Sequence, residues 1–251
     1  MDAPQTPAQE LVRHKRWVRG THWIITLSFF VLLFSGVEIL MVHPRLYWGE
    51  VGNDLTPALF ELPISRNYKH GGWENSNAFY SKAGSPVSAS RTYDIFNKNG
   101  WGRSLHFLAA WFLVITGVIY LLAALISRHL KKRFGLTSQV LKPGFLWGDF
   151  IKHFGKMPLI SDAETYGILQ KLTYLVVIFL LLPLIIITGL TMSPAITAAY
   201  PFLLKIFGGV QSARTIHFFT TIALVLFLII HVVMVIRTGF KKQMRAMTIG
   251  K

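Results

Sequence analysis

The chain has 251 residues, of which 52% are hydrophobic and only 15% charged, and its mean hydropathy is +0.45. This composition is too apolar for an ordinary soluble domain. The formal net charge of +15 would suit a nucleic-acid-binding protein, but the basic residues gather beside apolar segments, which argues against that class. The chain has no cysteine, which excludes disulfides, thiolate ligands, iron–sulfur clusters and covalently attached c-type haem.

Four apolar segments are long enough to cross the ~30 Å hydrocarbon core of a bilayer. They cover about residues 23–42, 105–126, 172–192 and 216–236. We therefore predict an all-α integral membrane protein, a four-transmembrane-helix bundle that forms a single membrane domain over residues 1–251. Its longest connections are an external loop over residues 43–103 and a cytoplasmic loop over residues 128–171.

The distribution of Lys and Arg predicts the orientation of these spans. Residues 128–171 contain eight bases against three acids, and bases also flank the first span on its N-terminal side and follow the fourth span. The connection between the third and fourth spans has only Lys205 before Arg214. Both termini are therefore predicted to be cytoplasmic, with the bases near anionic lipid. We expect the first span to be an uncleaved anchor, the alternative being a cleaved signal peptide.

Two histidines of the fourth span, His217 and His231, lie fourteen residues apart. A helix turns by ~100° and rises by ~1.5 Å per residue, so the two imidazoles lie ~40° apart around the helix and ~21 Å apart along it. One imidazole therefore lies in each leaflet, and both lie on the same face of the helix. Polar groups at such depth usually belong to a functional site or contact a polar partner. The simplest interpretation is two haems, one in each leaflet.

A short motif recurs where three spans begin, with an Arg three residues before a His and an aromatic residue directly after it. Its copies are residues 19–23, 103–107 and 214–218. If the His binds haem iron, Arg19, Arg103 and Arg214 lie one turn nearer water and can meet haem propionates. The alternative for a single copy is an interfacial Arg beside an aromatic belt residue. Three copies together with His231 favour haem binding.

The predicted topology pairs the histidines by depth. The first span starts inside and the fourth ends inside, so His22 and His231 lie on the cytoplasmic side. The second and fourth spans both start outside, so His106 and His217 lie on the external side. These residues supply four ligands for two iron atoms. An iron with two histidine ligands has both axial positions filled, which suits electron transfer.

Two glycines lie near the faces that carry these ligands. Gly36 is fourteen residues after His22, at the depth of the opposite haem, and Gly117 is eleven after His106, within ~20° of its face and ~16 Å deeper. Each would leave room for the other macrocycle, the alternative being ordinary small-residue helix packing. Glu38, one turn inside the outer end of the first span, is a candidate for quinone protonation, or it simply reaches lipid headgroups.

These residues resemble the bacterial di-haem cytochrome b family, which includes the membrane subunits of nickel–iron hydrogenases, formate dehydrogenases and thiosulfate reductases. The resemblance covers most of residues 13–247 and is most specific in the three Arg–His motifs, in Ser35-Gly36 and in His231. It implies that His22, His106, His217 and His231 bind two b haems. It also implies a multi-pass protein of the bacterial inner membrane that exchanges electrons between a quinone and an extracytoplasmic partner subunit.

Three functions are compatible with the sequence. The leading hypothesis is an electron-transfer subunit that links quinone to a periplasmic redox enzyme, and the chain looks closest to subunits accompanying molybdopterin oxidoreductases. The external loop is longer than in many members of the family, so the identity of the partner is not carried over. The second hypothesis is a stand-alone membrane oxidoreductase of the same fold that acts on a small external species. A transporter or metal channel, the third, would bind no haem and lacks the expected inverted repeats.

Overall fold

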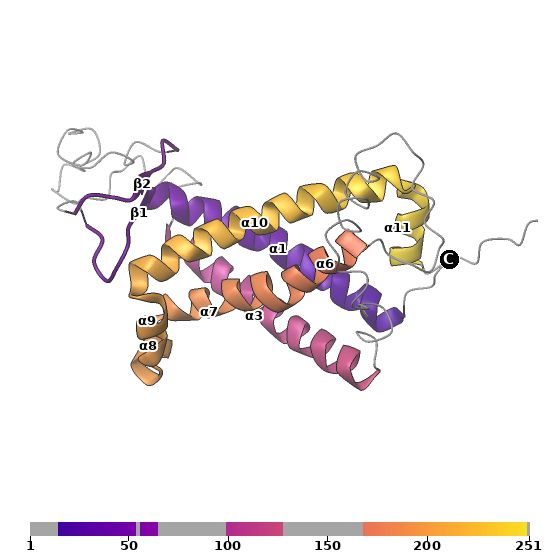
Figure 1. Ribbon diagram of the computed structural model, residues 1–251, viewed down its shortest axis with the longest axis horizontal. Coiled ribbons are helices and arrows are strands. Elements are labelled where there is room, and N and C mark those ends of the chain that lie inside the picture. The colour runs from indigo at the N-terminus through magenta and orange to yellow at the C-terminus, as the bar shows by residue number, and fades with distance from the viewer. Residues whose placement is uncertain (1–14, 54–55, 65–98, 128–167, 250–251) are drawn as a thin grey trace, which may run out of the picture. The chain divides into compact units, whose positions relative to one another are not determined.

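The computed structural model describes residues 15–53, 56–64, 99–127 and 168–249. This part of the chain contains four helices long and apolar enough to cross a membrane (Figure 1). The predicted all-α membrane fold with four spans is therefore confirmed. Most of the predicted external loop 43–103 and nearly all of the cytoplasmic loop 128–171 lie outside the described residues.

Three of the four spans begin earlier than their hydropathy indicates. The helices α1 (Arg16–Val42), α3 (Asn99–Ile126) and α10 (Val210–Arg237) each include the Arg of the Arg–His motif. Backbone hydrogen bonding continues into the turn before each apolar window, where charged, polar or small residues lower the hydropathy. At its other end α1 stops at Val42, shortly before Pro44, whose ring disfavours helical geometry in the residue that precedes it.

The packing of α1 shows which of its faces meets lipid. Thr21, Ser28 and Ser35, spaced seven residues apart, are buried, whereas Leu27 is 68% exposed and Phe30 is 51% exposed. Small polar residues inside and large apolar residues outside are typical of helices that pack against each other within a bilayer. The burial pattern of α1 thus supports the membrane assignment independently of its hydropathy.

The third span is interrupted. The helix α6 (Ile168–Val176) passes into a π-helix, η4 (Val177–Leu181), before α7 (Leu182–Thr191) resumes α-helical geometry. Pro183 lies in the first turn of α7, where its missing N–H breaks the regular hydrogen-bond ladder. Two short helices follow at an angle to α7 (Figure 1), namely α8 (Pro194–Ala199) and α9 (Phe202–Phe207).

The segment that follows α1 is fixed to the start of α10. It forms a small antiparallel hairpin from β1 (Arg45–Leu46) and β2 (Phe60–Glu61). The Gly49 amide donates to Ser212 Oγ at 2.7 Å, and the Gly49 carbonyl accepts from the Gln211 amide at 3.0 Å. The second of these bonds satisfies the Gln211 amide in the first turn of α10, which has no partner within the helix.

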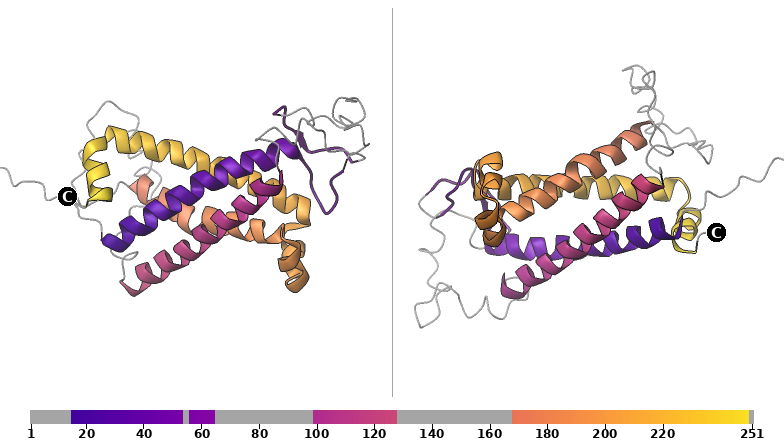
Figure 2. Two further views of the ribbon diagram at one scale, coloured as in Figure 1. Left: turned by 180° about the vertical axis from the view of Figure 1, so that it is seen from behind. Right: turned by 90° about the horizontal axis from the view of Figure 1, so that it is seen from below.

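The last helix, α11 (Phe240–Thr248), turns away from the end of α10 (Figure 2). The turn is made at Gly239, whose φ of +103° is readily adopted only by glycine. Lys241, Lys242 and Arg245 are exposed on α11, whereas Ala246 is buried. The chain therefore ends in an amphipathic helix rather than in an extension of the fourth span.

Contacts divide the chain into two compact units, each of which contains part of every span. The first contains residues 1–23, 117–180 and 226–251, and the second contains residues 24–116 and 181–225. His22 and His231 belong to the first unit, and His106 and His217 belong to the second. Each predicted ligand pair can therefore be described within one unit. The single membrane domain over 1–251 stays a prediction.

Candidate haem-binding sites

His106 on α3 and His217 on α10 lie opposite each other in the second unit. Their ring centroids are 6.4 Å apart, and the ring planes are inclined by 56°. A metal ion bound to two imidazole nitrogens at about 2 Å each holds the ring centroids about 6 Å apart. The spacing of this pair, which we call the external pair after its predicted depth, therefore fits one iron atom between the two rings.

Hydroxyl groups orient both rings of the external pair. Ser35 Oγ lies 2.9 Å from His106 Nδ1 and donates its own proton to the Val31 carbonyl at 2.7 Å. A hydroxyl has one proton, so Ser35 Oγ accepts from His106 Nδ1–H. The Nε2 lone pair of His106 is thereby left free to bind a metal.

The same arrangement holds the second ring. Thr188 Oγ1 donates to the Leu184 carbonyl at 2.7 Å and lies 3.0 Å from His217 Nδ1. Thr188 therefore accepts from His217 Nδ1–H and leaves Nε2 unprotonated, as Ser35 does for His106. Ligand orientation through the second ring nitrogen is a regular feature of metal-binding histidines.

A glycine follows each of these hydroxyl residues and lies against the same imidazole. A Cβ at Gly36 would be 3.5 Å from His106 Cε1, and a Cβ at Gly189 would be 3.4 Å from His217 Cε1. Ser35-Gly36 and Thr188-Gly189 are thus equivalent elements on the first and third spans. Sequence reasoning included Gly36 but missed the roles of Ser35, Thr188 and Gly189, although a hydroxyl residue before glycine in both spans was a readable signal.

His22 and His231 form the corresponding pair in the first unit. Their ring centroids are 6.4 Å apart with the planes inclined by 50°, the same separation as in the external pair. Phe227 stacks on His231 at 5.8 Å, and Tyr174 meets the same imidazole edge-on at 6.4 Å. The structure thus brings together both pairs that depth predicted from the sequence, and their role as iron ligands stays a prediction.

Arg19 and Trp23, which lie on either side of His22 in α1, form hydrogen bonds with α11. Arg19 Nη1 donates to the Thr248 carbonyl at 2.9 Å, and the Trp23 indole N–H donates to the Met247 carbonyl at 3.0 Å. Arg19 Nε is buried and has no hydrogen-bond partner within the described part of the chain. A buried donor without a partner is costly, and a haem propionate is the kind of acceptor that would satisfy it.

The other two arginines of the motif have different surroundings. Arg214 donates to the backbone carbonyl of His43, just beyond α1, and Arg103 is exposed on α3. Gly117 has no atom within 4 Å of the position its Cβ would occupy. Their predicted contacts with haem stay predictions.

The two histidine pairs suit haem iron better than a bare metal ion. Among the residues that the structure describes, no three histidine, aspartate or glutamate side chains gather as a metal-binding group. A haem iron needs only two axial ligands from the protein, because the macrocycle supplies the other four. The paired histidines, the unprotonated Nε2 atoms of His106 and His217, and the unpartnered Arg19 Nε together fit b haems.

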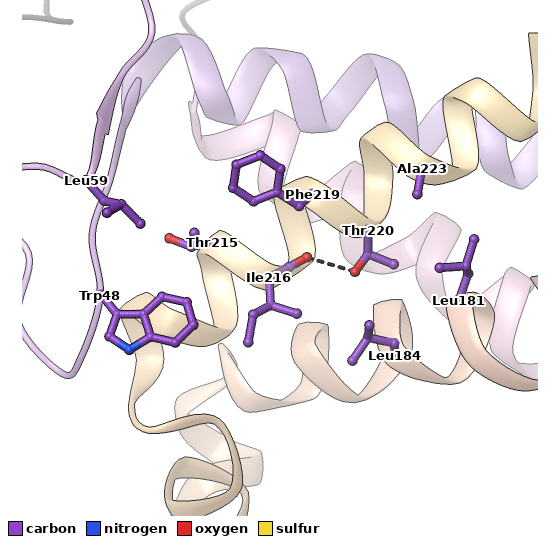
Figure 3. A pocket seen from close by; sticks show the side chains of 9 residues that line it. All are labelled: Trp48, Leu59, Leu181, Leu184, Thr215, Ile216, Phe219, Thr220 and Ala223. Carbon is purple, nitrogen blue, oxygen red and sulfur yellow. Dashed lines mark hydrogen bonds between the residues drawn. The ribbon is translucent and has the colours of Figure 1, made fainter.

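An apolar groove of about 380 Å³ also lies in the second unit (Figure 3). Trp48 and Leu59 line it from the segment after α1, Leu184 from α7, and Ile216 and Phe219 from α10. Its lining includes no acid, base or histidine. The groove supplies no chemical group for a reaction, so the candidate sites are the two histidine pairs.

Comparisons with known proteins show the family to which the chain belongs. The family described as prokaryotic cytochrome b561 matches residues 13–250. A protein of Azospira oryzae named putative protein-methionine-sulfoxide reductase subunit YedZ1 is 28% identical over 223 residues, which cover 88% of this chain and 89% of the relative. No solved structure matches the chain.

Proposed function

We propose a function from the premise that this chain belongs to the prokaryotic cytochrome b561 family. It is a multi-pass helical protein of the bacterial inner membrane, in a family of membrane electron-transfer cytochromes. The proposal is that it binds two b haems and carries electrons across the membrane between the quinone pool and a redox enzyme on the periplasmic side.

The observation that carries this proposal is the pair of equal histidine separations. Both pairs have ring centroids 6.4 Å apart, and α10 contributes one histidine to each. Fourteen residues of continuous helix place His217 and His231 ~21 Å apart along its axis. One helix thus supplies a ligand to a site near each face of the membrane.

The residues around the sites hold the rings and limit the chemistry. Bound b haem supplies reversible one-electron transfer between ferric and ferrous iron. If both histidines of a pair bind one iron, no coordination position is left open for a substrate. Ser35 and Thr188 fix the tautomers of the external pair, and Phe227 and Tyr174 pack against His231. Ligands held in this way need little rearrangement when the iron changes charge.

We further propose that the external partner is a catalytic reductase subunit. The Azospira oryzae relative is by its name a subunit of a protein-methionine-sulfoxide reductase. We extend that assembly to this chain, with electrons passing to a periplasmic, molybdopterin-dependent subunit that reduces oxidised methionine in proteins. The word subunit in the relative's name favours this function over a stand-alone oxidoreductase.

Electron delivery through two separate sites tests the function. We expect a reduced quinol analogue to reduce both haems of the purified wild-type protein, and an added external acceptor to reoxidise them. His217→Ala or His231→Ala should remove one haem, retain the other and stop transfer from quinol to acceptor. His43→Ala, an exposed histidine outside the spans, is the matched control and should retain both haems and transfer. Transfer at the wild-type rate in both single-haem variants would contradict the proposal.

A further inference from the structure

Glu38 is a fully buried acid without a partner. Its side chain is 0% exposed, and neither carboxyl oxygen has a hydrogen-bond partner within the described residues. A Cβ at Gly102 of α3 would overlap Glu38 Oε2, so the carboxyl lies directly against the backbone of α3 and would have to shift if a side chain were present there. Burying a carboxylate without compensation is unfavourable, so the charge on Glu38 depends on what lies near it.

Two helices place Glu38 close to the external histidine pair. On α1, Glu38 is three residues after Ser35, whose hydroxyl binds His106. On α3, Gly102 is four residues before His106. Residues three or four apart are neighbours on one face of a helix. The Glu38 carboxyl therefore lies about one turn from His106 along both helices.

Among the described residues, no cation forms a hydrogen bond with this carboxyl. Arg103 on α3 is exposed, and Arg214 on α10 donates to the His43 carbonyl. In the adjoining parts of these elements the charged and titratable side chains are Arg103 and His106 on α3, Arg214 and His217 on α10, and His43, Arg45, Tyr47, Glu50 and Glu61 after α1. None of them donates a hydrogen bond to Glu38, since both of its oxygens lack partners.

We infer that Glu38 is the proton-binding group linked to the redox state of the external haem, an inference that rests on the proposed function. A ferric haem with two neutral imidazoles carries one net positive charge on iron and macrocycle, which favours the Glu38 carboxylate. When one electron from the donor reduces this iron to ferrous, that charge is lost, and Glu38 binds one proton. When the electron leaves for the external acceptor, the proton leaves as well.

The expected change in the proton affinity of Glu38 is large enough to measure. At an effective dielectric constant of ~20, removing a unit charge ~10 Å away changes the proton affinity of a carboxyl by roughly tenfold. Protons need to travel only a short distance, because Glu38 is one turn from the end of α1 at Val42, and His43 beyond it is exposed. The proton is therefore exchanged with the external aqueous phase.

Redox titration at several pH values, followed in the visible and infrared, tests this inference. In the wild type we expect the midpoint potential of one haem to fall as pH rises, and reduction to produce a carboxylic-acid C=O band. Glu38→Gln, which keeps the shape but cannot ionise, should lose both the band and the pH dependence of that haem. Glu50→Gln, which changes an exposed acid in the segment after α1, is the control and should retain both.

The inference is overturned if wild-type protein with both haems shows no such band, or if Glu38→Gln keeps the wild-type pH dependence. The wild-type infrared measurement tests whether a carboxyl is protonated on reduction even if Glu38→Gln fails to assemble. Absence of haem from the wild type would instead refute the proposed function.

Discussion

Ser35 and Thr188 decide which nitrogen of each external imidazole is available for a metal. Each hydroxyl gives its single proton to a carbonyl of its own helix and accepts from Nδ1 of the facing histidine. This orientation is built into α1 and α7, not into the helices that carry the ligands. The histidines alone, read from the sequence, give the ligand type but not the tautomer.

Replacing these hydroxyls should weaken the external haem site. We expect Ser35→Ala and Thr188→Val each to lower the affinity for that haem by about 10–100-fold, because the imidazole loses the partner that orients it. Haem transfer to an excess of apomyoglobin, followed by absorbance, measures the loss. Ser28→Ala removes a buried hydroxyl one heptad earlier on α1 and should leave haem affinity unchanged. Equal retention in all three variants would show that the Nδ1 contacts contribute nothing.

The sequence predicted the membrane-spanning helices well, because their hydropathy is the dominant signal. Long apolar runs gave four spans, and the predicted ends at residues 42 and 126 match those of α1 and α3. The helices α1, α3 and α10 start before the predicted apolar spans because charged, polar or small residues lower the hydropathy of their first turns. The π-helix η4 was marked only by Pro183, and the β1–β2 hairpin depends on contacts between segments far apart in the chain. Periodicity does not report such contacts.

The helix α11 is a further element that the local sequence did not predict. Its apolar residues are too few for a span, and its position is set by Arg19 and Trp23, more than two hundred residues earlier in the chain. These two side chains donate to the last carbonyls of α11, which have no partner within the helix. The N-terminal part of α1 and the C-terminal helix therefore stabilise each other.

Removing one of these hydrogen bonds should loosen α11. We expect Trp23→Phe, which keeps the aromatic ring but loses the donor, to raise the population of undocked α11 about fivefold, as expected for loss of about 1 kcal/mol. Limited trypsin cleavage at Lys241, Lys242 and Arg245, followed by mass spectrometry, measures this change. Trp48→Phe alters an exposed indole and should cleave at the wild-type rate. Equal rates for Trp23→Phe would show that the bond to Met247 does not hold the helix.

In the whole molecule, the pairing of four histidines that are far apart in the chain was predictable from the sequence. Two histidines of different spans can share one iron only if they lie at the same depth in the bilayer. Orientation from the basic residues and a helical rise of ~1.5 Å per residue suffice to match His22 with His231 and His106 with His217. The third span contains no histidine, and the roles of Thr188 and Gly189 become clear only from their contacts with His217. Side-chain burial and the charge of Glu38 likewise depend on packing that spacing alone does not specify.

The haem-to-chain ratio of the purified wild-type protein, together with its electron paramagnetic resonance spectrum, tests the central claim most directly. Two equal histidine pairs predict two haems per chain, both non-covalent b type, low-spin and unreactive towards carbon monoxide because both axial positions are filled. A ratio of one, or a high-spin haem that binds carbon monoxide, would contradict the assignment of two histidine ligands to each iron.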